Sequence, residues 1–183
     1  VVGLVLLDAA LPTNWSHANP VDIIGDAPVD SYVLTLQTLL ADRGYHCVNI
    51  GKMHINPYDA PGGFHQRLIM ENKDRPLFLE ERDRAIYDEW DKALRARKLI
   101  KPSRYNRHAA DPEAYKRALG AFVWDLDADM HPDNFIGDTA CWWIGDRKNQ
   151  DPLFLQIGFP GPHPPYDPTP DALAAYADVD IPV

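Results

Sequence analysis

Two apolar segments, each running into a turn that carries cationic or proton-transferring side chains, constrain the fold of this chain most. The first covers residues 46–50 and is followed by Lys52 and His54, and the second covers residues 153–159 and is followed by His163. Both segments are short, apolar and bounded by turn residues, which is typical of buried β-strands.

A helical pattern precedes each apolar segment. Apolar residues recur every three or four positions over about residues 31–43, where Gly44 supplies the stop, and again over about residues 132–147. The order helix, strand, long insertion, helix, strand predicts an α/β fold with a mostly parallel sheet flanked by helices.

The segment between these units, residues 56–131, is expected to be an insertion of loops and helices. Pro and Gly are frequent over residues 56–76, so this part is expected to be irregular. Helices are expected at about residues 79–98 and 113–119, joined by a basic connection over residues 99–112. On the first helix we expect two exposed pairs of opposite charge: Asp88 with Lys92, and Asp91 with Arg95.

Length and charge limit the class of protein. A chain of 183 residues fits one domain or most of one, and because it begins without Met we expect residues 1–183 to be a partial domain from inside a longer protein. The net charge of −9 argues against a nucleic-acid or anionic-membrane surface. No apolar run reaches the length of a membrane span. The oligomeric state and the choice between cytoplasm and periplasm stay open.

The cysteines form neither a disulfide framework nor a zinc motif. Cys47 lies in an expected strand and Cys141 in an expected helix, so we expect both to be buried, inert thiols.

An acidic stretch resembles a calcium-binding loop only in part. Acidic residues alternate at Asp125, Asp127 and Asp129, but Met130 replaces the turn Gly and Ile136 stands where the bidentate Glu belongs. We therefore expect a solvated acidic loop here.

The two strand ends are expected to form one site. In open α/β sheets, sites form at the carboxyl ends of the strands, where Lys52, His54 and His163 would open onto one cleft. A Lys side chain suits a sulfate or phosphate oxygen, and an imidazole exchanges protons near neutral pH. The alternative is a solvated Lys, a structural His54 and a proline-rich connector in which His163 is incidental.

Taken together, the two segments resemble the sulfatase family. Residues 36–54 end in Gly44-Tyr45-His46-Cys47-Val48-Asn49-Ile50-Gly51-Lys52-Met53-His54, similar to that family's helix, strand and Gly-Lys-x-His element. Residues 152–168 read Pro-Leu-Phe-Leu-Gln-Ile-Gly-Phe-Pro-Gly-Pro-His-Pro-Pro-Tyr-Asp-Pro, similar to its later strand and His loop. These stretches cover about a quarter of the chain, and their order and separation agree with the family.

The resemblance implies an alkaline-phosphatase-like α/β sandwich that hydrolyses a small anionic ester, with a formylglycine nucleophile and a bound Ca²⁺ or Mg²⁺. By the same resemblance, Lys52 holds the anionic group and the nucleophile. His54 helps to deprotonate the aldehyde hydrate and so to release sulfate. His163 contacts the ester and assists departure of the leaving group.

The chain also departs from the family pattern. No Cys-x-Pro-x-Arg or Ser-x-Pro-x-Arg motif is present, and the family's Asp ligands and its Asn or His ligand for the metal are absent. We therefore expect the nucleophile and the metal ligands to lie outside this chain, and the chain alone to be inactive. The alternatives are a phosphonate or phosphate ester hydrolase of the same superfamily, and a binding or scaffold domain without a nucleophile.

Overall fold

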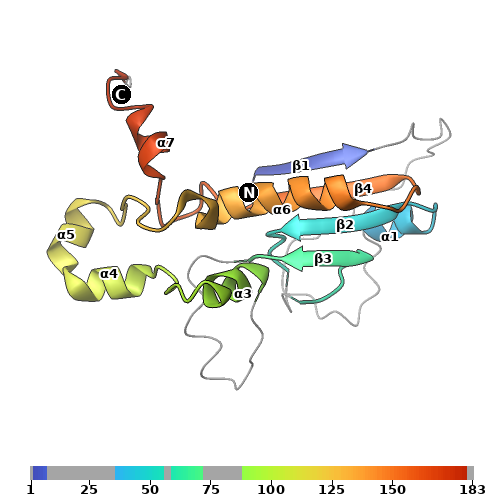
Figure 1. Ribbon diagram of the computed structural model, residues 1–183, viewed down its shortest axis with the longest axis horizontal. Coiled ribbons are helices and arrows are strands. Elements are labelled where there is room, and N and C mark those ends of the chain that lie inside the picture. The colour runs from blue at the N-terminus through green and yellow to red at the C-terminus, as the bar shows by residue number, and fades with distance from the viewer. Residues whose placement is uncertain (1, 8–35, 56–58, 72–87, 181–183) are drawn as a thin grey trace.

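The computed structural model describes residues 2–7, 36–55, 59–71 and 88–180. Its centre is a sheet with the strand order β1-β4-β2-β3 (Figure 1). The strands are β1 (Val2–Leu7), β2 (His46–Gly51), β3 (Gln66–Ile69) and β4 (Leu153–Phe159). β2 runs parallel to both β3 and β4, whereas β1 pairs with β4 in the antiparallel sense. The predicted α/β fold with a mostly parallel sheet is confirmed.

The two faces of the sheet bury different clusters. Because successive side chains of a strand point to opposite faces, alternate residues of β2 and β4 enter separate cores. On one face, Val48, Leu155 and their alternate neighbours pack against α6 (Pro132–Asp146). On the other, Cys47 and Phe154 pack with Leu40 of α1 (Leu36–Ala41). Each fully buried Val, Leu or Ile stabilises the fold by about 1.5–3 kcal/mol.

The elements next to this sheet lie close to their expected positions. β2 and β4 occupy the two expected strand segments, and α6 differs by one residue from the helix expected over 132–147. α1 ends before Gly44, whose φ of 85° is the left-handed conformation that terminates a helix.

The expected irregular stretch over residues 56–76 was wrong in part, because it contains β3. Among the described strands, this four-residue strand pairs with β2 alone and so forms an edge of the sheet. The expected connection over residues 99–112 was also wrong in part. It contains α4 (Arg104–Ala110), which begins where the Ser103 hydroxyl accepts a hydrogen bond from the Tyr105 N–H at 3.2 Å.

The helix expected over residues 79–98 is described only in its second half. The described helix, α3 (Glu89–Ala96), is capped by Asp88, whose carboxylate accepts a hydrogen bond from the Asp91 N–H at 2.8 Å. Residues 72–87 lie outside the described residues. The expected exposed pairs were wrong: Asp88 and Asp91 are buried, and Asp91 pairs with Lys101 at 2.7 Å.

The remaining helices of the described ranges are short. They are α5 (Pro112–Arg117), the single 3₁₀ turn η1 (Ala128–Met130) and α7 (Pro170–Ala174). α4 and α5 contain no buried residue and extend away from the sheet in Figure 1. None of the helices in the described ranges is long and apolar enough to cross a membrane.

The cysteines differ in their environments. Cys47 is buried, as expected, and burial raises the pKa of its thiol. Cys141 is exposed on the outer face of α6, so the expectation that it is buried was wrong.

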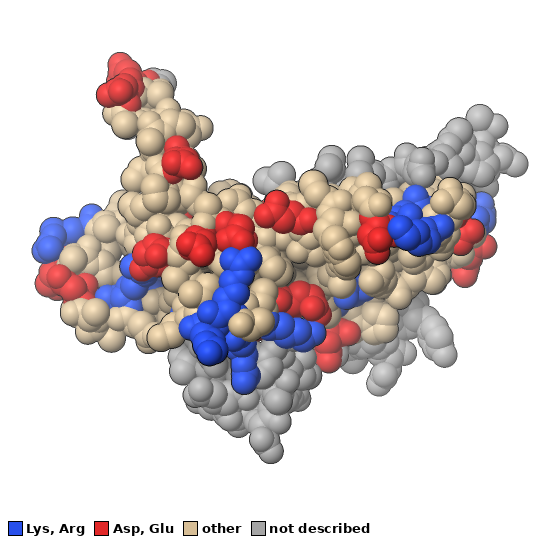
Figure 2. All heavy atoms as spheres, viewed as in Figure 1, with Lys and Arg blue, Asp and Glu red and all other residues tan. Residues whose placement is uncertain are grey.

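Acidic and basic side chains are interspersed over the described part of the face shown in Figure 2. Two carboxylates of the acidic stretch form ion pairs with Arg side chains. Asp125 contacts Arg107 at 2.6 Å, and Asp129 contacts Arg97 at 2.7 Å. The Arg97 guanidinium lowers the pKa of Asp129.

Candidate functional site

The carboxyl ends of β2 and β4 lie side by side. The two strands are parallel neighbours, and Gly51 at the end of β2 is in register with Gly158 near the end of β4. Lys52 directly follows the first strand, and the loop with His163 follows the second. Both predicted site segments therefore begin at the same end of two parallel, neighbouring strands.

Glycines let the two strand ends approach closely. The Lys52 N–H donates a hydrogen bond to the Gly158 carbonyl oxygen at 2.8 Å. A Cβ atom added to Gly158 would lie 1.8 Å from the Lys52 carbonyl oxygen, and one added to Gly51 would lie 2.2 Å from the Gly158 oxygen. Lys52 itself is only 4% exposed. Its backbone is thus fixed against β4 at a separation that only glycine permits.

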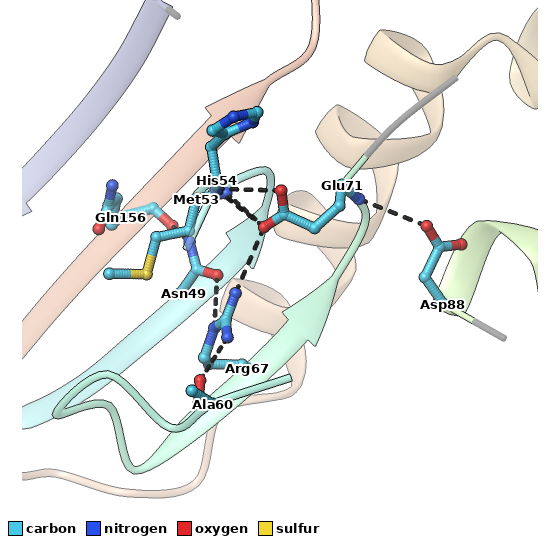
Figure 3. Close-up of polar contacts among 8 residues, drawn as sticks. All are labelled: Asn49, Met53, His54, Ala60, Arg67, Glu71, Asp88 and Gln156. Carbon is cyan, nitrogen blue, oxygen red and sulfur yellow. Dashed lines mark hydrogen bonds and ion pairs between the residues drawn. The ribbon is translucent and has the colours of Figure 1, made fainter. Parts of the chain in front are cut away.

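The turn after Lys52 is held by a buried carboxylate. Glu71, two residues beyond the end of β3, accepts hydrogen bonds from the N–H groups of Met53 and His54 at 2.9–3.0 Å. His54 has a φ of 60°, in the left-handed region, and its side chain is exposed. In Figure 3 the His54 ring projects from this turn on the side away from Arg67.

Glu71 is itself held by a polar network inside the fold. The Arg67 Nη2 atom lies 3.6 Å from Glu71 Oε1, which is an ion-pair contact between two side chains that are 4% and 0% exposed. Arg67 also donates to Asn49 Oδ1 of β2 at 3.2 Å and to the Ala60 carbonyl oxygen. Burial lowers the pKa of Arg67, and the charge of Glu71 opposes this effect.

The network continues to the start of α3. The Glu71 N–H donates to Asp88 Oδ2 at 3.3 Å (Figure 3). Burial, and then the charge of neighbouring Asp91, raise the pKa of Asp88 to about 6, while Lys101 acts in the opposite direction. A carboxyl group that titrates near pH 6 therefore lies one hydrogen bond away from Glu71.

A second carboxylate holds the loop after β4. Asp133, in the first turn of α6, accepts a hydrogen bond from the Gly161 N–H at 3.1 Å. A Cβ atom on Gly161 would lie 2.4 Å from Asp133 Oδ2, so a side chain at this position would displace the Asp133 carboxylate from its present place. The His163 N–H donates to the Pro160 carbonyl oxygen at 3.0 Å, which closes the turn.

The ring of His163 is exposed and has a defined tautomer in its neutral form. Its Nδ1 atom lies 2.7 Å from the Pro164 carbonyl oxygen. Because a carbonyl oxygen only accepts hydrogen bonds, this contact requires the proton on Nδ1. The lone pair of the neutral ring is then on Nε2, which is the arrangement needed to accept a proton from a bound molecule.

Glu71, Arg67 and Asp133 were not predicted from the sequence. All three act on backbone N–H groups or on one another, which leaves no spacing signal in the sequence. The sequence contains one signal for this network, in the short stretch from Gln66 to Met70. Its apolar residues directly follow Arg67, which a surface strand would place in solvent.

A hollow of about 280 Å³ lies near the amino end of β2, opposite the strand ends that carry the candidate site. His46, Gln66, Trp143 and Arg147 are among its lining residues. His46 is the first residue of β2, whereas Lys52 follows its last. This hollow is therefore separate from the candidate site.

The described residues do not supply a metal site or a nucleophile of the expected type. No group of three or more His, Cys, Asp or Glu side chains in these ranges is arranged to hold a metal ion. The Cys47 sulfur faces the Gln37 carbonyl oxygen at 3.4 Å inside the core. The side chains present thus do not fit a metal-bound formylglycine centre by themselves.

Comparison with known proteins gives one informative similarity. The chain is 24% identical to an arylsulfatase of Clostridium perfringens (strain 13 / Type A), over 83% of this chain and 31% of that protein. The chain therefore spans about a third of the length of the curated relative it matches. No family model matches the chain. This distant similarity supports a sulfatase-like relationship.

Proposed function

We propose that this chain is part of a sulfatase-type hydrolase that cleaves sulfate esters. In this proposal the formylglycine nucleophile and the divalent metal, Ca²⁺ or Mg²⁺, belong to segments outside the chain. The observation that carries the proposal is the shared sheet edge at which Lys52 and the His163 loop begin, on adjacent parallel strands. The similarity to an arylsulfatase supports the same chemistry.

Lys52 takes the role of binding the anionic group. An ammonium group that is largely withdrawn from water interacts more strongly with an oxyanion than a solvated one does. Its backbone is fixed by Gly158, so little reorganisation is needed when charge develops on the ester oxygens. Because the sulfate group is common to all substrates, hydrolysis of each of them would depend on Lys52, whatever the leaving group is.

His163 takes the role of protonating the leaving group. Once Nε2 carries a proton, it can donate that proton to the departing oxygen, while Nδ1 keeps its contact with the Pro164 carbonyl oxygen. His54, whose side chain is also exposed, would carry out the second proton transfer of the reaction, the deprotonation that helps to release sulfate.

The test is hydrolysis of aryl sulfates by the longer protein that the proposal implies. Substituting Lys52→Ala should lower kcat/KM by about 10²-fold or more for every sulfate ester, as loss of one preorganised electrostatic contact does. Lys116→Ala is the matched control, since Lys116 is an exposed Lys of α5 paired with Glu113. The 183-residue chain alone should show no turnover.

Two results would contradict the proposal. One is hydrolysis of phosphonate or phosphate monoesters in preference to sulfates, which would move the protein to another branch of the same chemistry. The other is no loss of activity on Lys52→Ala, which would remove Lys52 from the site.

A further inference from the structure

Glu71 makes an unusual set of contacts for a buried carboxylate. Its Oε1 atom accepts from the Met53 N–H at 3.0 Å and from the His54 N–H at 2.9 Å, and its Oε2 atom accepts from the same His54 N–H at 3.0 Å. The Glu71 side chain is 0% exposed. All of these contacts go to the turn that carries the candidate site residues.

The turn needs this support because its backbone is strained. A non-glycine residue in the left-handed region costs about 1–2 kcal/mol, and His54 has a φ of 60° there. Two successive N–H groups that point at one acceptor form a small anion-binding concavity. Here the protein's own carboxylate fills that concavity. A substrate anion must therefore be bound by side chains such as Lys52 and not by these two N–H groups.

The carboxylate cannot easily move away from the turn. Arg67 contacts it from β3 and is fixed in turn by Asn49 of β2 (Figure 3). The network thus starts on β2, crosses to β3 and returns to the turn that ends β2. A shift of Glu71 would break contacts on both strands.

We propose that Glu71 is a positioning residue of the candidate site, which orients the His54 imidazole by holding the Met53–His54 backbone. For its catalytic consequence this inference rests on the proposed function. The positional claim itself concerns only the turn, and it can be tested without any assay of activity.

Glu71→Gln is the most informative substitution. It keeps the size of the side chain, but one oxygen becomes an NH₂ group that donates and cannot accept. At least one contact to the turn is lost, whereas the packing stays similar. Glu89→Gln is the matched control, because Glu89 is a partly exposed Glu of α3 paired with Lys92.

The first measurement uses ¹⁵N-labelled protein. In Glu71→Gln the remaining oxygen can still accept from both N–H groups at the Oε1 position, but an NH₂ group faces the His54 N–H in place of Oε2. The amide proton of His54 should therefore shift upfield and exchange at least tenfold faster than in wild type, whereas Glu89→Gln should leave it unchanged. Unchanged resonances and exchange rates in Glu71→Gln would overturn the inference. If Glu71→Gln does not fold, Glu71→Asp replaces it, since it keeps the charge but withdraws the carboxylate from the turn.

The second measurement separates positioning from a general structural role. In the longer protein, Glu71→Gln should lower kcat by about 10–10²-fold, which is the scale of misplacing a catalytic group. The double variant Glu71→Gln/His54→Ala should be no slower than His54→Ala alone, because both changes remove the same imidazole from its place. Multiplying losses would overturn the inference. A protein without sulfate ester hydrolysis would contradict the proposed function, and the amide measurement would still decide the positional claim.

Discussion

The backbone N–H of Lys52 donates to the carbonyl oxygen of Gly158 at 2.8 Å, one residue beyond the last paired residue of β2. This bond extends the β2–β4 ladder into the candidate site. It ties the position of the buried Lys to the strand that leads to His163. The two halves of the candidate site are therefore linked through the backbone before any side chain is considered.

Replacing Gly158 by Ala should break this link. The new Cβ atom would lie 1.8 Å from the Lys52 carbonyl oxygen, so the strand ends must separate. We expect a loss of unfolding free energy of roughly 1–3 kcal/mol, measured by urea denaturation, as for other overpacked buried sites. Gly137→Ala in α6 is the control, because a Cβ there meets nothing within 4 Å. It should be neutral or stabilise by about 0.5–1 kcal/mol. Equal effects of the two substitutions would contradict the expected clash.

The stability of the protein should respond to the titration of Asp88. Because burial raises the pKa of Asp88 from 3.8 to about 6, the folded chain keeps a proton between about pH 4 and 6 that the unfolded chain has lost. This carboxyl group therefore makes the fold less stable as pH rises through that window. At neutral pH, the ionised Asp88 lowers the free energy of unfolding by on the order of 2–3 kcal/mol.

Asp88→Asn should remove this cost and keep a good helix cap. The difference in unfolding free energy between Asp88→Asn and wild type should thus grow in favour of the variant from pH 4 to pH 7, measured by urea denaturation at each pH. Asp111→Asn makes the same change at the exposed cap of α5 and controls for the chemistry of the substitution. A difference that is constant with pH would show that Asp88 does not titrate in this way.

Removing the Asp133 carboxylate should loosen the loop that carries His163. In Asp133→Ala the Gly161 N–H loses its acceptor, at a cost of about 1 kcal/mol, and hydrogen exchange at Gly161 should become roughly fivefold faster. Asp133→Asn keeps an acceptor oxygen and should stay close to wild type. Both variants remove the charge at the start of α6, so this comparison isolates the hydrogen bond. Equal protection of Gly161 in wild type and Asp133→Ala would contradict the role of this contact.

In the longer protein, the effect of His163→Ala should depend on the leaving group. If His163 protonates the departing oxygen, the loss of kcat/KM should be large for esters of poor leaving groups. It should be small for activated aryl sulfates, which depart with little protonation. A series of aryl sulfates of increasing leaving-group pKa measures this slope, with the exposed His108→Ala as the control. A uniform loss across the series would assign His163 another role.

The sequence predicted the parts of the fold in which a long pattern and a buried face coincide. The buried runs of β2 and β4 and the 15-residue helix α6 are such cases. β3 was missed because it is four residues long and contains Arg67, a charged side chain that belongs to a buried network. The exposed pairing of Asp88 was wrong because an Asp suits an exposed ion pair as well as a buried cap, and local spacing does not distinguish the two.

The candidate site shows the same division. Lys52 and His163 could be assigned to one sheet edge, because parallel strands end on the same side. Glu71 and Asp133 could not be found, because each accepts hydrogen bonds from backbone N–H groups that almost every residue has. Their role depends on the register of β2 with its neighbours and on the start of α6, which only the folded chain defines.

The pairing of β2 with β4 has a consequence for folding kinetics. Asn49 and Gln156 lie opposite each other in the sheet although 107 residues separate them in the chain. Closing a loop of this length costs entropy before any contact is gained, and such distant pairings slow folding. α6 and the helices of the insertion can form from local contacts at an earlier stage. We therefore expect the strand ends that carry Lys52 and the His163 loop to come together late in folding, after the helices have formed.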